Sequence, residues 1–160
     1  MVAPTLRRLA AALTAGAIVL ASCSGAERLS VGNFTEAANE ECASLRQASD
    51  DFRQAQDPSL TGDDVAEFVH KVAERLRVLV ENLDTLVPPE TMEADVDELL
   101  GVLSDYADGL DELAVATGRG QTFQGVLQEQ TGIVNRLNRL APRATALVAE
   151  LGLVSCIVPS

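Results

Sequence analysis

The sequence predicts an all-α protein folded as an antiparallel, up-down-up-down four-helix bundle. Apolar residues recur at steps of three and four through four successive segments, which is the period of an amphipathic helix. Short breaks that contain proline or glycine separate these segments. No segment alternates apolar and polar residues as a half-buried strand does. Helices joined by short connections favour antiparallel neighbours, so we expect the chain to run up and down in turn.

The first expected helix begins at Asn33, which is spaced with Glu36 as in a capping box. Its stripe consists of Phe34, Ala38, Cys42, Leu45, Ala48, Phe52 and Ala55. The stretch QDPSLTG, residues 56–62, contains both proline and glycine and therefore ends this helix.

The second and third expected helices carry the most regular stripes. Both alternate steps of four and three, a seam that packs against other helices. The second stripe is Val65, Val69, Val72, Leu76, Leu79, Leu83 and Leu86, and the third is Met92, Val96, Leu99, Leu103, Tyr106, Leu110 and Leu113. The pair Pro88-Pro89 stops the second helix and precedes the third.

The fourth expected helix follows the turn ATGRGQ, residues 116–121. Its stripe consists of Val126, Gln130, Ile133, Leu137, Leu140, Ala144, Leu147 and Leu151. Pro142 lies within this stripe, and we expect it to kink or divide the helix because it lacks a backbone N–H. Gly152 is expected to end the helix.

The first 23 residues have the three parts of an export signal. Arginines at positions 7 and 8 precede an uncharged stretch over residues 9–20, and two small residues lead into Cys23. The apolar stretch is about a dozen residues, whereas a membrane-spanning helix needs roughly 20. The sequence LASC, residues 20–23, resembles the lipobox of bacterial lipoproteins. The alternative is an ordinary signal that is cleaved nearby and leaves Cys23 free.

The lipobox resemblance implies that residues 1–22 are removed and that Cys23 carries a diacylglyceryl thioether. Residues 23–32 then form the lipidated cysteine and a small, polar tether, and residues 33–160 form the helical bundle domain. Two or three acyl chains hold a protein at a membrane almost permanently, since each buried methylene contributes about 0.8 kcal/mol. We therefore expect a lipid anchor at the extracytoplasmic face of the cell membrane.

The charge of the expected mature chain excludes some classes of partner. Without the signal, 24 acidic and 10 basic residues remain, so the formal net charge changes from -12 to -14. Nucleic-acid binding requires basic groups that neutralise phosphates, so we expect no nucleic acid as a partner. An anionic membrane surface would repel this domain. Attachment is therefore expected to rest on the lipid.

The three cysteines predict one disulfide. An unpaired thiol is a liability in an exported protein, and lipidation of Cys23 leaves Cys42 and Cys156 as a pair. In an up-down-up-down bundle the fourth helix ends beside the start of the first, where these two cysteines would meet. The cysteine positions and the expected topology therefore agree on a terminal disulfide.

The sequence offers little for catalysis or metal binding. Glu67 and His70 have the Glu-x-x-His spacing of di-iron bundles, but those sites need a second such pair and His70 is the single histidine. A surface pair is the favoured interpretation. The chain has neither a set of residues for a Ser-His-Asp triad nor a glycine-rich phosphate loop. We expect no enzyme activity, no cofactor and no metal.

The third expected helix is strongly acidic. If the chain turns near Gly118, Glu98 lies about level with Arg136 and Arg139, and Asp95 lies near Arg143. Interhelical ion pairs and solvated charges then account for much of this face. By this register four acids remain unpaired and are candidates for contact with a partner: Asp105, Asp108, Asp111 and Glu112.

The same register places Tyr106 opposite Gln130, both on otherwise aliphatic stripes. A polar layer in a helical core usually fixes the register of the helices, which is the favoured interpretation. The alternative is that the two residues mark the wall of an internal cavity. Many Val, Leu and Ala residues and few aromatic ones would suit an acyl chain better than a flat cofactor.

Arginine outnumbers lysine eleven to one, and LVPPE and ELGLVSC mark a helix break and the closing segment. With the lipobox, these features resemble small actinobacterial lipoproteins that have a helical, cysteine-paired domain. This resemblance narrows the location rather than the activity. We expect a membrane-anchored binding or assembly module that contacts an envelope protein. The alternative is a carrier of a lipid-like, hydrophobic ligand in the bundle interior.

Overall fold

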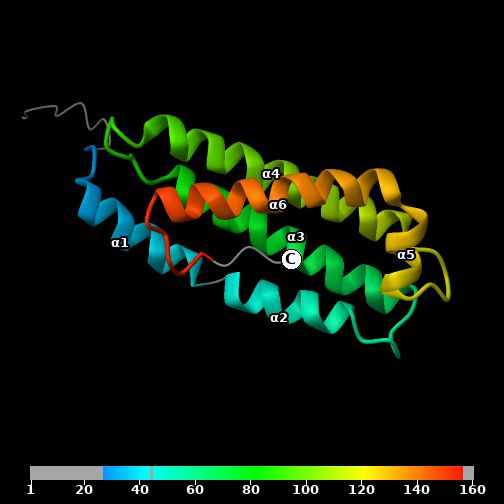
Figure 1. Cartoon of the computed structure of the whole chain (residues 1–160). Helices are drawn as coiled ribbons and strands as arrows, with labels where there is room; N and C mark the ends of the chain where they lie inside the picture. The colour runs from blue at the N-terminus through cyan, green and yellow to red at the C-terminus, as the bar shows by residue number, and fades with distance from the viewer. Residues whose placement is uncertain (1–26, 44, 157–160) are drawn as a thin grey trace, which may run out of the picture.

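The structure, a computed structural model, describes residues 27–43 and 45–156. Over these residues it contains helices and no strand (Figure 1). The helices are α1 (Val31–Cys42), α2 (Leu45–Ala55), α3 (Asp63–Asp84), α4 (Glu93–Ala116), α5 (Phe123–Glu129) and α6 (Thr131–Glu150). The prediction of an all-α fold with a disulfide is confirmed. The expected signal and Cys23 lie outside the described residues.

The first expected helix is two helices, α1 and α2. Helix α1 ends at Cys42, Ala43 is its C-cap residue, and α2 starts at Leu45. Both helices bury one continuous stripe, including Ala38, Cys42 and Ala48, each fully buried. A break that keeps the same face toward the core leaves the apolar spacing unchanged, so the pattern did not reveal it.

The fourth expected helix is also divided, but not at proline. The break between α5 and α6 lies at Gln130, whose backbone has φ -97° and ψ 45°. Pro142 lies inside α6 on an exposed position, so the helix is not divided at this proline. Gly152 adopts φ 70°, and the N–H of Leu153 donates to the carbonyl of Val148 at 2.9 Å. This is a Schellman-type end, as expected for a glycine after a helix.

The helices α3 and α4 form the centre of the fold. They pack against each other, α2 packs on α3, and α6 packs on α4. Figure 1 shows the long helices lying roughly along one axis, with α5 at one end and the start of α1 at the other. The core between them is mostly aliphatic, and its largest fully buried side chains include Phe34, Leu45, Leu76, Leu79, Leu99, Leu103, Leu110, Leu113 and Leu147.

Gly109 allows α4 and α6 to approach closely. It is buried on α4, and a Cβ atom added there would lie 2.7 Å from Cδ2 of Leu137 on α6. Because real Cβ atoms do not approach a carbon so closely, a larger residue would force Leu137 or the helix to move. The absence of a side chain at this position therefore sets part of the α4–α6 contact.

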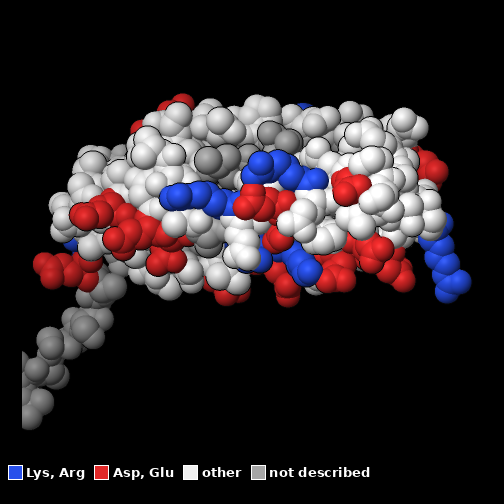
Figure 2. Space-filling model, turned by 90° about the horizontal axis from the view of Figure 1, so that it is seen from below, with Lys and Arg blue, Asp and Glu red and all other residues white. Residues whose placement is uncertain are grey.

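The surface is predominantly acidic. Figure 2 shows one face on which acidic side chains are spread widely, whereas most basic ones gather near the middle. Several of these charges form ion pairs between neighbouring helices, including Arg75 with Asp51 and Arg143 with Glu98. Exposed pairs such as Arg143 with Glu98 contribute about 0–1 kcal/mol each, whereas Asp51 is buried beside Arg75. The fold therefore rests mainly on the apolar core.

Candidate functional site

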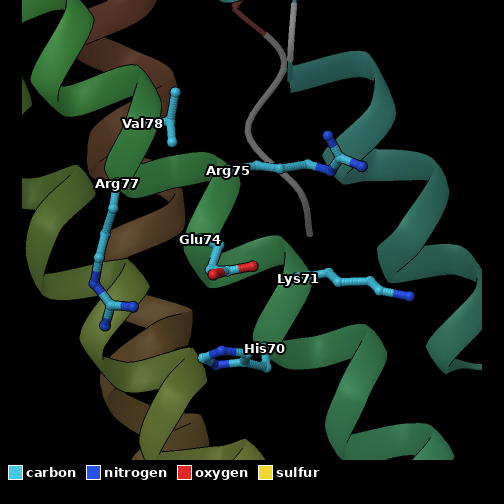
Figure 3. A pocket seen from close by; sticks show the side chains of 6 residues that line it. All are labelled: His70, Lys71, Glu74, Arg75, Arg77 and Val78. Carbon is cyan, nitrogen blue, oxygen red and sulfur yellow. The ribbon is translucent and has the colours of Figure 1, made fainter.

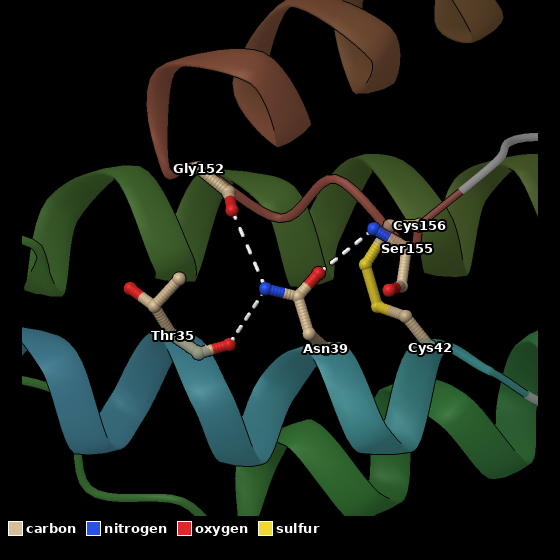
Figure 4. Close-up of a disulfide and its surroundings, with 6 residues drawn as sticks. All are labelled: Thr35, Asn39, Cys42, Gly152, Ser155 and Cys156. Atoms are coloured by element: carbon tan, nitrogen blue, oxygen red, sulfur yellow. Dashed lines mark hydrogen bonds between the residues drawn. A yellow bond between two sulfur atoms is a disulfide. The ribbon is translucent and has the colours of Figure 1, made fainter.

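Cys42 and Cys156 form a disulfide that joins the end of α1 to the segment after α6 (Figure 4). Their Cα atoms lie 4.7 Å apart, within the range of native disulfides. The two residues are 114 positions apart, so the bond closes most of the described chain into one loop. The cysteine pairing predicted from the sequence is confirmed.

Asn39 holds the same junction through hydrogen bonds. Its Nδ2 donates to the carbonyl of Thr35 at 2.8 Å and to that of Gly152 at 3.3 Å, while its Oδ1 accepts from the N–H of Ser155 at 2.8 Å (Figure 4). The side chain thus satisfies two backbone groups in the segment after α6. Sequence reasoning missed Asn39, because an asparagine within a helix gives no signal of a partner more than a hundred residues away.

A shallow trough of about 700 Å³ follows the outer face of α3. It is lined by His70, Lys71, Glu74, Arg75, Arg77 and Val78. Figure 3 shows Lys71 and Arg75 extending toward α2, while His70 and Arg77 extend toward α4. Each cation already has an acidic neighbour: Lys71 pairs with Glu67 at 2.6 Å and Arg75 pairs with Asp51 at 2.7 Å. The trough is therefore a surface of internal ion pairs rather than a free cationic site.

Three of the four acids singled out on α4 have basic partners. Asp108 lies 3.0 Å from Arg77, which also pairs with Asp111. Asp111 lies 2.7 Å from Nδ1 of His70. Partial burial would raise the pKa of Asp111, but hydrogen bonds from His70 and Arg77 outweigh it and hold that pKa below its usual value. The expectation that these acids stay unpaired is thus wrong for Asp108 and Asp111.

Glu112 pairs with Arg136 at 2.5 Å, so it too has a partner. Asp105 is exposed on α4 and forms no ion pair with any residue that the structure describes. Of the predicted partner-facing acids, Asp105 alone keeps a free carboxylate on this count. The acidic face of α4 therefore serves mainly to bind neighbouring helices.

The ion pairs between α4 and α6 correct the predicted register. Arg143 donates to both oxygens of Glu98 at 2.6 Å, whereas Glu98 was expected beside Arg136 and Arg139. Its hydrogen bonds with Arg143 lower the pKa of Glu98. Asp95 does lie near enough to Arg143 to help raise the pKa of that guanidinium, as expected. The register of α6 on α4 differs from the predicted one because the chain turns through residues 117–122 and α5 before α6 begins, rather than at Gly118 alone.

Glu67 and His70 do not form a metal site with other described residues. Glu67 pairs with Lys71, and this contact lowers its pKa. His70 faces Asp111 on α4. No group of three or more His, Cys, Asp or Glu side chains in the described part of the chain is placed to hold a metal ion. The surface-pair interpretation agrees with these contacts.

An apolar groove of about 300 Å³ lies between α2, α4, α5 and α6. Four uncharged polar residues line it, namely Gln56, Tyr106, Gln124 and Asn138. The rest of its described lining is apolar and consists of Phe52, Leu110, Leu113, Phe123, Leu127, Val134, Leu137 and Ala141. No described lining residue is charged, which distinguishes this groove from the trough on α3.

Tyr106 and Gln130 occupy different surroundings. Tyr106 is 3% exposed, and burial raises its pKa to about 12, so its hydroxyl stays protonated at neutral pH. Gln130 is half-buried at the break between α5 and α6, and it is not among the described residues that line the groove with Tyr106. Of the α6 residues that line the groove with Tyr106, the polar one is Asn138, in keeping with the corrected register.

The second half of the expected tether, residues 23–32, contacts the loop between α3 and α4, and α1 already begins at Val31 within that range. The N–H of Leu29 donates to the carbonyl of Val87 at 3.0 Å, and Arg28 donates to that of Pro88 at 3.1 Å. Arg28 also pairs with Glu93 at 2.8 Å. None of the described helices combines the length and apolar character needed to cross a membrane.

Comparison with known proteins adds no assignment. No protein-family model, curated protein or solved structure matches the chain. Any function must therefore be argued from the residues and their geometry.

Proposed function

We propose that this chain is a lipoprotein anchored by Cys23 at the extracytoplasmic face of the cell membrane. In this proposal its helical domain is a binding or assembly module of the cell envelope. The observation that carries the module is the uncharged, apolar groove between α2, α4, α5 and α6. The anchor rests on the LASC sequence, since Cys23 itself lies outside the described residues.

The contacts of Arg28 and Leu29 support a defined orientation on the membrane. Arg28 is five positions after Cys23, so an extended chain between them spans at most about 18 Å. Arg28 is fixed beside the α3–α4 loop, at the start of α4. The 24 residues of α4 span about 36 Å toward α5. A lipid on Cys23 would therefore hold the domain by one end and leave the α5 end away from the bilayer.

We further propose that the six helices act as an antiparallel four-helix bundle. In this arrangement α1 with α2 takes the first position, and α5 with α6 takes the fourth. Contacts between elements support it, because residues later in α1 and α2 contact residues earlier in α3. Examples are Glu41 with Asn82 and Asp51 with Arg75 on one side of α3.

A binding module benefits from such an anchor. Restriction to one surface raises the effective concentration of two tethered partners, so that a weak contact becomes sufficient. The groove supplies a place for such a contact, since concave apolar sites with a few polar groups are the usual form of binding sites. Its position near α5 keeps it accessible to another envelope protein when the opposite end is attached to the membrane (Figure 1).

A carrier of a lipid-like ligand is the second candidate, and the apolar lining of the groove favours it. The groove would then hold part of an acyl chain against its Phe and Leu side chains. The two candidates differ in what occupies the groove in cells, a segment of protein or a lipid.

Two measurements on the full chain, purified from the membranes of its native host, separate these candidates. Native mass spectrometry reports any lipid that copurifies in stoichiometric amount, and chemical crosslinking in intact cells reports protein neighbours. A binding module predicts a reproducible crosslinked envelope protein and no retained lipid beyond the anchor. A stoichiometric lipid without any reproducible protein crosslink would replace the module with the carrier. The Cys23→Ala variant is the control for the anchor, and its crosslink should weaken.

A further inference from the structure

The groove between α2, α4, α5 and α6 is unusual in this molecule because no charged residue lines its described part. The trough on α3 is the opposite case, since five of its six described lining residues are titratable. The groove also contains three carboxamide side chains, Gln56, Gln124 and Asn138. Each carboxamide offers both hydrogen-bond donors and an acceptor.

The charge of the lining argues against a phospholipid or a fatty acid as the occupant. Their phosphate or carboxylate groups need a cation or several donors near the mouth of a site. The described lining offers neither a lysine nor an arginine. The volume also argues against a two-chain lipid. At about 30 Å³ for a group the size of a water molecule, 300 Å³ accommodates about ten methylene groups.

The same features match a short stretch of polypeptide. Ten methylene-sized groups correspond to about two or three aliphatic side chains, which the half-buried apolar residues of the lining would contact. Peptide groups carry one donor and one acceptor each, and the N–H groups and the oxygen of a carboxamide can pair with both. Gln124 is exposed on α5 beside the apolar lining, where it can reach the main chain of a docked segment.

We propose that this groove binds an uncharged, apolar segment of an envelope protein, with two or three of its side chains seated against the half-buried Leu127, Val134 and Ala141. Polar main-chain groups of that segment hydrogen-bond to Gln56, Gln124 and Asn138. This inference rests on the proposed binding module and specifies the chemistry of its partner. Lack of charge in the groove selects against acidic and basic segments, because a charge placed there would lose water without gaining a counter-ion.

Photocrosslinking from defined positions of the full, anchored chain tests the inference. The probe is benzoylphenylalanine in place of Gln124, which lines the groove, or in place of Gln128, which is exposed on α5 and does not line it. A third position, Val78, reports the trough on α3. After irradiation of cells, the crosslinked peptide is sequenced by mass spectrometry.

The inference predicts a crosslink from position 124 that is at least tenfold stronger than from position 128. It also predicts that the attached peptide is an uncharged, apolar stretch. A charged peptide, a lipid adduct, equal yields from both α5 positions, or no adduct from position 124 would overturn it. A protein adduct from position 78 alone would overturn this inference while the binding module stands. No protein adduct from any position would remove both.

A charge placed in the groove provides an independent test. Leu127→Asp introduces a carboxylate at a half-buried lining position, and Gln128→Asp introduces the same charge on an exposed neighbour. Leu127→Asp should reduce the crosslink from position 124 at least tenfold, and Gln128→Asp should leave it within twofold. The helix content of both variants, measured by far-UV circular dichroism, shows whether either one unfolds. If Leu127→Asp unfolds, Gln124→Glu with the probe at position 56 replaces it. An unchanged crosslink in a folded groove variant would contradict the proposal.

Discussion

Two regions of this molecule are held together by different kinds of contact. Around α1, a disulfide joins Cys42 to Cys156, and Asn39 adds hydrogen bonds to the segment after α6. Around α5, the closure is made by a hydrogen bond of 2.9 Å from the N–H of Gly62 to the carbonyl of Gln121 and by edge-on packing of aromatic rings. The first region is fixed by a covalent bond, whereas the second depends on non-covalent packing.

This difference corresponds to the proposed roles of the two regions. A region beside a membrane anchor must keep its geometry while the attached domain moves. A groove that accepts a peptide benefits from side chains and a short helix that adjust on binding, and regions held by few contacts open at lower free energy. The ring centroids of Phe52 and Phe123, 5.5 Å apart, lie in the lining of the groove itself. Stability and binding are thus assigned to different regions of the same bundle.

The largest expected effect comes from removal of the disulfide. The variant with Cys42→Ala and Cys156→Ala should lose about 4 to 5 kcal/mol of unfolding free energy, since the bond closes a loop of more than a hundred residues. Urea unfolding with circular dichroism measures the loss, and reduced wild-type protein is the matched control. Hydrogen exchange should increase more in α1 than in α5. Equal increases in both helices would contradict the claim that the disulfide fixes the region around α1 and not the region around α5.

Substitution of Gly109 tests the close packing of α4 on α6. Gly109→Ala should lower the unfolding free energy by up to about 2 kcal/mol, because overlap of the new Cβ with Leu137 outweighs the gain in helix propensity. Gly101 lies on the same helix with no atom within 4 Å of an added Cβ. Gly101→Ala should therefore raise the unfolding free energy by about 0.5 to 1 kcal/mol. Stabilisation by both alanines in urea unfolding would mean that the helices are not in close contact there.

A smaller effect is expected at Asn39. Asn39→Ala leaves the carbonyl of Gly152 and the N–H of Ser155 without these hydrogen bonds, at a cost of about 1 to 2 kcal/mol. Asn33→Ala, at an exposed position of α1, should change the unfolding free energy by less than about 0.5 kcal/mol. Chemical unfolding of both variants compares them. Equal, small losses would show that the disulfide alone fixes this junction.

The smallest expected effect concerns the pH dependence of the α3–α4 contact. Because the pKa of Asp111 is lowered in the folded state, its ionised form stabilises the fold above its ordinary pKa of 3.8, and this contribution is lost as the pH falls through the lowered value. Asp111→Asn should remove less than about 1 kcal/mol at neutral pH and flatten the acid limb of the stability profile. Exposed Asp105→Asn is the control, and an identical flattening by it would contradict this role of Asp111.

The sequence alone predicted the helices whose apolar stripes are uninterrupted. The seams that contain Leu76 and Leu103 correspond to α3 and α4, and the count of cysteines predicted the pairing of Cys42 with Cys156. The breaks near Ala43 and at Gln130 could not be predicted from the spacing, because the apolar face continues across them. Periodicity reports which face is buried, but not whether every hydrogen bond along the helix is formed.

The details of the candidate site required three-dimensional positions. The partner of Glu98 depends on how many residues the turn before α6 contains, and α5 occupies residues that a tight turn at Gly118 would have left in the long helix. That shift brings Asn138, rather than Gln130, into the groove with Tyr106. The absence of charge from the groove could not be read from composition either, since its lining comes from four separate helices.

The central claim is that one end of the domain is attached to the membrane through Cys23, which leaves the α5 end available for binding. Mass spectrometry of the amino-terminal peptide, from full-length protein extracted from host membranes, tests this claim most directly. The account predicts that the peptide begins at Cys23 and carries a diacylglyceryl group on its sulfur. A peptide with an intact bond between residues 22 and 23, or one with a free thiol at Cys23, would contradict it.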